Sequence, residues 1–174
     1  MRRILNATYK AAGMLSAFLI LAICLLISAQ IVLNGMGRLM PGVLPSTIPS
    51  YADFAGFMLA GATFLAMAYT LRSGGHIRVN LVVQRLSPRV VLIAEFLALT
   101  VASVFVGYAL YFSGALVLES LYYGDVSNGI IPVPLWLPQS AMTFGMGLLL
   151  IALLHSLVDL ITTGTSVLNT PDEV

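Results

Sequence analysis

Four long apolar runs dominate this chain and constrain its fold more than any other feature. A helix needs about 20 apolar residues to cross a bilayer, and every run meets that length. The runs cover residues 11–33, 51–71, 90–118 and 137–163. Charged residues make up 9% of the chain, against roughly 25% in a soluble domain. We therefore predict an all-α membrane protein with four transmembrane helices, in which residues 1–174 form a single domain.

The basic residues are distributed unevenly between the connecting segments. Seven of the eight Lys and Arg residues lie either ahead of the first run or between the second and third runs. These seven are Arg2, Arg3, Lys10, Arg72, Arg78, Arg85 and Arg89. Basic connectors of membrane proteins stay on the cytoplasmic side, so both termini are predicted to be cytoplasmic. The first run exceeds the apolar core of a secretory signal, which has about 7–15 residues, and is expected to remain as a span.

The connector between the second and third runs is predicted to contain a short interfacial helix over about residues 76–87. Helical spacing places polar residues on one of its faces, valines and a leucine on a second, and Arg78 with Arg85 on a third. Such a helix lies in the membrane interface, where its arginines reach lipid headgroups. The expected lipid or partner contacts are Arg72, His76, Arg78, Arg85 and Arg89, together with Trp136 in the opposite headgroup zone.

The opposite, extracytoplasmic side is expected to hold two irregular segments. We predict that the first span ends at Asn34-Gly35. Residues 40–50 contain three prolines and cannot form a continuous helix, because each proline removes a donor and restricts the residue before it. Residues 132–138 also contain three prolines and are predicted to lead in an extended form into the fourth span.

Small residues recur four positions apart in three of the runs. The pairs are Gly56 with Ala60, Ala98 with Ala102, and Ala141 with Gly145. In lipid there is little hydrophobic drive between helices, so close backbone approach at small residues supplies much of their association. These pairs are predicted to pack helices, either within this chain or against another membrane subunit.

One polar pair lies inside the fourth run. His155 and Asp159 are four residues apart and face the same way on a helix. Ionisable residues within a membrane are candidates for function, so a proton relay is one interpretation. A hydrogen-bonded structural pair near the cytoplasmic end is the other.

The motifs and ligand sets of common catalytic and cofactor sites are missing from the sequence. Cys24 is the single cysteine, which excludes an intrachain disulfide. Only His155 of the two histidines lies inside a run, whereas a haem needs two axial ligands in the spans. The sequence has no Cys/His cluster for zinc, no Walker loop and no Gly-x-Ser-x-Gly motif. We expect no enzyme activity, no cofactor, no metal and no nucleic-acid partner.

Two segments and the overall plan resemble a known family. Residues 72–80, Arg-Ser-Gly-Gly-His-Ile-Arg-Val-Asn, are similar to the family stretch Arg…Gly-x-His-Ile-x-Val-Asp, with Asn80 in place of the usual aspartate. Residues 127–136, Ser-Asn-Gly-Ile-Ile-Pro-Val-Pro-Leu-Trp, are similar to its Ile-Pro-x-Trp region. Together with four spans and both ends inside, these segments resemble the small membrane subunit of tripartite ATP-independent periplasmic (TRAP) transporters.

The resemblance implies a function without chemistry of its own. It implies a small permease subunit in the bacterial inner membrane, which scaffolds a large multi-span permease subunit. That large subunit takes up organic acids by symport with a cation, after a periplasmic binding protein has delivered them. Membrane lipids are the remaining partner. Two alternatives stay open: a self-sufficient small transporter or channel that works as a homo-oligomer, and the membrane anchor subunit of a redox enzyme.

Overall fold

The structure is a computed structural model that describes residues 2–39, 45–73 and 87–163. Its helices are α1 (Arg2–Leu39), α2 (Tyr51–Arg72), α4 (Pro88–Tyr123) and α5 (Trp136–Thr163). All four are long and apolar enough to cross a membrane, which confirms the predicted all-α membrane protein with four spans. The predicted interfacial helix lies outside the described residues except at Ser87, where the backbone is extended and precedes α4.

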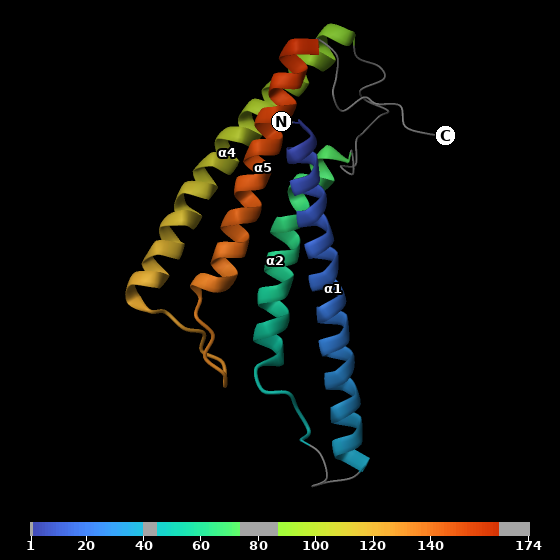
Figure 1. Ribbon diagram of the computed structural model, residues 1–174, viewed down its shortest axis with the longest axis vertical. Helices are drawn as coiled ribbons and strands as arrows, with labels where there is room; N and C mark the ends of the chain where they lie inside the picture. The colour runs from blue at the N-terminus through green and yellow to red at the C-terminus, as the bar shows by residue number, and fades with distance from the viewer. Residues whose placement is uncertain (1, 40–44, 74–86, 164–174) are drawn as a thin grey trace, which may run out of the picture.

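The four helices lie side by side in the order α1, α2, α5, α4 (Figure 1). Helix α2 packs against both α1 and α5, while α4 packs along the far side of α5. The chain therefore forms one layer of helices rather than a closed bundle. No described element covers either broad face of this layer.

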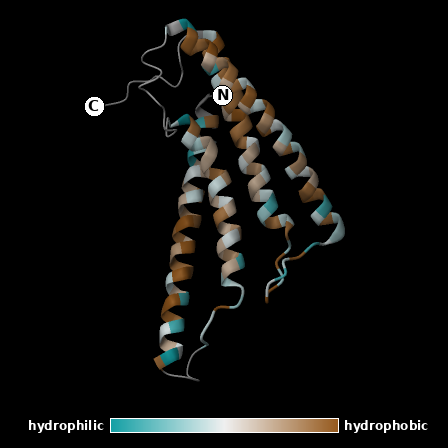
Figure 2. Cartoon of the chain, turned by 180° about the vertical axis from the view of Figure 1, so that it is seen from behind, coloured by the Kyte–Doolittle hydropathy of each residue, from teal (hydrophilic) through white to brown (hydrophobic). Residues whose placement is uncertain are grey.

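The buried residues follow the contacts within the layer. They include Leu65 and Ala68 of α2 and Leu148, Ala152 and Leu153 of α5. Large apolar side chains elsewhere are exposed, above all on the edge helices α1 and α4. Hydrophobic residues extend along the length of the helices, and hydrophilic residues gather mainly toward the helix ends (Figure 2). Exposed apolar surface of this extent suits a protein whose solvent is lipid.

Helix α1 does not end at Asn34-Gly35 as predicted. It continues through Gly35 and Gly37 to Leu39, because the returning chain packs along its last turns. A Cβ atom on Gly37 would lie 3.1 Å from Cβ of Ser46, so a small residue lets the two segments approach. A glycine inside a helix costs about 1 kcal/mol relative to alanine, and packing of this kind can offset that cost.

Helix α4 also runs past its predicted end at residue 118. It ends at Tyr123, and Gly124 follows in the left-handed conformation with φ of 68°. Glycine is the usual residue at this position because it has no Cβ to strain the backbone.

The return segment after α1 is held by one buried amide. The Gln30 side chain is only 4% exposed. Its Oε1 accepts a hydrogen bond from the Ile48 N–H at 2.7 Å, and its Nε2 donates to Thr47 Oγ1 at 3.1 Å. Both ends of the buried amide are thus paired, which fixes the chain just before α2 begins.

Candidate bracing seam between α2 and α5

The contact between α2 and α5, called the seam below, joins the two halves of the molecule. Helices α1 and α2 form one antiparallel pair, and α4 and α5 form another. The two pairs meet along α2 and α5, which run in the same direction (Figure 1). Any relative movement of the two pairs must therefore disturb the seam.

The middle of the seam depends on direct backbone contact. Gly145 of α5 is buried, and a Cβ atom added to it would lie 2.5 Å from the carbonyl carbon and oxygen of Phe64. A turn away, a Cβ on Gly61 would lie 3.7 Å from Cβ of Ala141. The predicted pair Ala141 and Gly145 thus lies on the face of α5 that meets α2, inside this chain.

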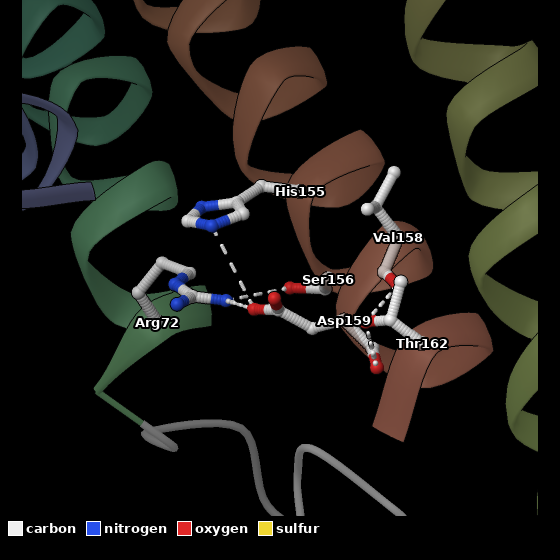
Figure 3. A network of polar contacts seen from close by, with 6 residues as sticks. All are labelled: Arg72, His155, Ser156, Val158, Asp159 and Thr162. Atoms are coloured by element: carbon white, nitrogen blue, oxygen red, sulfur yellow. Dashed lines mark hydrogen bonds and ion pairs between the residues drawn. The ribbon is translucent and has the colours of Figure 1, made fainter. Parts of the chain in front are cut away.

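One end of the seam, formed by the last turns of α2 and α5 and called the inner end below, carries a buried polar cluster (Figure 3). Arg72 of α2 reaches Asp159 of α5, with 3.3 Å between Nη1 and Oδ2. The same Nη1 donates to Ser156 Oγ at 3.3 Å. His155 Nε2 lies 3.7 Å from the same Asp159 oxygen. The structure therefore brings His155 and Asp159 together and adds Arg72 to them.

This cluster is shielded from its surroundings. The side chains of Arg72, His155 and Asp159 are 21%, 13% and 8% exposed, respectively. Unpaired charges are costly where water is scarce, so the guanidinium and the carboxylate stabilise each other here. Arg72, which the sequence predicts to contact lipid or a partner, ties α2 to α5 through its side chain.

At the opposite end of the seam, called the outer end below, the two irregular connectors meet. Ser50 precedes α2 with φ of 55°, and its hydroxyl accepts a hydrogen bond from the Ile131 N–H at 2.9 Å instead of capping the helix. Gly129 packs against Asp53 in the first turn of α2, where an added Cβ would overlap the carboxylate. Glycine at this position therefore permits the close approach of the two connectors.

The connector before α5 is itself braced as a narrow hairpin. The Ser127 N–H donates to the Val133 carbonyl at 2.9 Å, and the Leu135 N–H donates to the Asp125 carbonyl at 3.0 Å. A single antiparallel bridge pairs Val126 with Pro134. The predicted extended entry to the fourth span, residues 132–138, thus pairs over its first part and becomes helical at Trp136.

The other predicted site residues in the described part of the chain lie on α2, on α4 and at the start of α5. Gly56 is exposed on α2 with no heavy atom within 4 Å of an added Cβ, and Ala60 is half-buried. Ala98 is exposed on α4, while Ala102 packs against the core. Arg89 is exposed in the first turn of α4, and Trp136 is half-buried at the start of α5. His76, Arg78 and Arg85 lie outside the described residues.

The polar cluster at the inner end stabilises the contact between α2 and α5. Its groups are positioned to hold two helices together by charge and hydrogen bonds. Among the described residues, no group of three or more His, Cys, Asp or Glu side chains is placed to hold a metal ion.

Four helices that are long and apolar enough to cross a bilayer, packed side by side, define a multi-pass membrane protein. Residues 27–163 match the family described as "Tripartite ATP-independent periplasmic transporters, DctQ component". The chain belongs to this family, the small membrane subunits of TRAP transporters, as the motifs in its sequence indicated. Comparison with curated proteins and comparison with solved structures each found no match.

Proposed function

We propose that this chain is a non-catalytic small permease subunit that braces the large multi-span subunit of a TRAP-type transporter. The observation that carries this proposal is the single helical layer, in a chain of this family, with its two broad faces uncovered by described elements. Because the ion pair and the close helix contact hold the seam together, the layer is suited to support a large subunit that changes conformation. The apolar faces of the layer suit burial against that subunit and against lipid.

The transport chemistry is assigned to the partners. The large subunit moves an organic acid, coupled to a cation, and a periplasmic binding protein delivers the acid. The spans of this chain support that division. Charged side chains are rare in them, and Arg72 and Asp159, at the inner ends of α2 and α5, pair with each other. The chain therefore holds the large subunit in position and does not contact the substrate.

The large subunit is proposed to pack on the face of α2 that carries Gly56. Ala52, Gly56, Leu59 and Thr63 are all exposed and follow one another at helical spacing, and Leu59 is the one large side chain among them. At about 100° per residue, they lie within about 60° of one another around the helix. Small residues let a neighbouring backbone approach closely in lipid, which favours this face for a partner helix.

Replacing Gly56 with leucine tests this assignment. The bulkier side chain would hold the partner helix away, and a loss of about 1.4 kcal/mol raises the Kd for the large subunit roughly tenfold and so lowers its recovery. The measurement is co-purification of the co-expressed large subunit on a tagged small subunit. Gly114→Leu on α4 is the matched control, since an added Cβ there also meets no heavy atom within 4 Å. Undiminished recovery with Gly56→Leu would contradict the assigned face.

The chain is proposed to lie in the bacterial inner membrane with both termini in the cytoplasm. The first residues of α1 and the last residues of α5 lie toward the same end of the layer (Figure 1), where α2 ends at Arg72 and α4 begins with Arg89 in its first turn. Basic residues favour the cytoplasmic side. A fluorescent protein fused at the C-terminus should mature, whereas a periplasmic C-terminus would leave it dark.

A further inference from the structure

Two buried polar atoms near the inner end of the seam have no hydrogen-bond partner among the described residues. They are the hydroxyl oxygen of Tyr9 on α1 and Nδ1 of His155 on α5. Tyr9 is only 1% exposed, and it belongs to the same core cluster as Leu71 of α2 and Leu160 of α5. A buried polar group without a partner is costly, because it has lost its hydrogen bonds to water.

Tyr9 lies at the level of the ion pair. Gly13 of α1 packs against Tyr69 of α2, where an added Cβ would lie 2.9 Å from the tyrosine ring. Tyr9 comes four residues before Gly13 in α1. Because α1 and α2 are antiparallel, Tyr9 is level with Arg72, which follows Tyr69 by three residues. At 1.5 Å per residue the offset is about 2 Å.

His155 reaches the same level from the third helix. Arg72 donates to Ser156, the residue next to His155. The His155 ring points from α5 toward α2 (Figure 3), with its Nε2 facing the Asp159 carboxylate 3.7 Å away. The start of α1 lies near both α5 and the end of α2 (Figures 1 and 2). Three helices therefore bring Tyr9, Arg72 and His155 to one place.

The unpaired atoms of Tyr9 and His155 are closed off from partner chains and from lipid. Tyr9 is enclosed by the chain itself, and Nδ1 of His155 is shielded although the whole side chain is 13% exposed. A neutral imidazole whose Nε2 faces a carboxylate carries its proton there, so Nδ1 is an acceptor. A phenol can donate or accept. Water is small enough for such a site, and buried waters typically bond to polar groups that otherwise have no partner.

We infer that one internal water molecule binds between Tyr9 and His155 and joins α1 to the ion pair of the seam. The water donates to Nδ1 of His155 and accepts from the Tyr9 hydroxyl. Polar contacts then continue through the imidazole to Asp159 and Arg72. The edge helix α1 is thereby held to α5 as well as to α2. This water site is independent of the face of the layer that carries the large subunit.

A double-mutant cycle on the full chain in mixed micelles tests whether the two side chains share a ligand. Tyr9→Phe removes the hydroxyl and keeps the ring, so it should lower the equilibrium constant for folding about fivefold, the usual net effect of one hydrogen bond. In a His155→Phe background, the same change should have less than about a twofold effect, since the water has already lost its other partner. Additive effects of the two substitutions, or no effect of Tyr9→Phe, would overturn the inference.

Tyr69→Phe is the matched control for the lost hydroxyl. Tyr69 lies on α2 one turn from the ion pair, but it is 44% exposed. Its hydroxyl can bond to solvent in the folded and unfolded chain alike, so this substitution should change the folding constant by less than about twofold in either background. Equal effects of Tyr69→Phe and Tyr9→Phe would show that the buried site is not the cause.

Solid-state NMR of the transporter in bilayers identifies the ligand without an unfolding measurement. The chain has two histidines, so His76→Gln confines an isotopic label at histidine Nδ1 to His155. Magnetisation from water should reach this nitrogen, and Tyr9→Phe should reduce the transfer several-fold, whereas Tyr69→Phe should not. If no magnetisation reaches Nδ1 in the unsubstituted site, or if Tyr9→Phe leaves the transfer unchanged, no water is shared and the inference is wrong.

Discussion

Replacing Arg72 with alanine is expected to lower the free energy of unfolding by about 3–5 kcal/mol. Removing one partner of a buried ion pair leaves the other charge desolvated, which is the costly outcome. Here Asp159 would stay 8% exposed at the inner end of the seam without the guanidinium that lies 3.3 Å away. Arg72 is itself 21% exposed, which favours the lower end of that range. The measurement is equilibrium unfolding in mixed micelles with increasing detergent denaturant.

Two further variants separate the ion pair from a general loss of charge. Arg89→Ala removes an exposed arginine from the first turn of α4 and should change stability by less than about 1 kcal/mol. The exchanged variant, Arg72→Asp with Asp159→Arg, should recover part of the lost stability. If the Arg72→Ala and Arg89→Ala variants unfold at the same denaturant concentration, the ion pair does not stabilise the seam.

Replacing Gly145 with alanine is expected to destabilise the chain by about 1–3 kcal/mol, although alanine is the better helix former. The added Cβ would lie 2.5 Å from the backbone carbonyl of Phe64. Backbone atoms cannot rotate away as a side chain can, so α2 and α5 must move apart. The same unfolding measurement detects this loss, and a cysteine pair with a cross-linker across the seam detects the wider spacing.

Gly147 supplies the matched control, since it lies two residues further along the same helix. The nearest atom to a Cβ there is Leu110 Cδ1 at 4.0 Å, which is ordinary contact. Gly147→Ala should therefore leave stability unchanged or raise it by up to about 1 kcal/mol, through helix propensity. Equal destabilisation by both substitutions would show that contact with Phe64 is not the cause.

The number of helices and their class follow from the sequence because a bilayer permits few backbone structures. Apolar runs of this length must form helices when water is absent, since every backbone group needs a partner. The ends of the helices depend on packing instead. Asn34-Gly35 locally favours the end of a helix, but α1 continues to Leu39, where Gly37 packs against Ser46.

Only some of the residues that form the seam can be predicted from the sequence. The four-residue spacing of His155 and Asp159 places them on one face without knowledge of the fold. Arg72, which contacts Asp159, is 87 residues from it in the sequence. No local sequence pattern predicts a contact between residues so far apart. Gly56 and Gly145 likewise stand in equivalent spacing patterns, yet one is open and the other meets a backbone. The order of the helices in the layer decides between them.

The central claim is that this chain supports a transporter without carrying a solute itself. Uptake into proteoliposomes under an inward sodium gradient tests it most directly, with a labelled organic acid that the binding protein is shown to bind. We predict uptake when this chain, the large subunit and the binding protein are all present, and none with this chain alone. Uptake by this chain alone would contradict the claim, as would full uptake by the other two components without it.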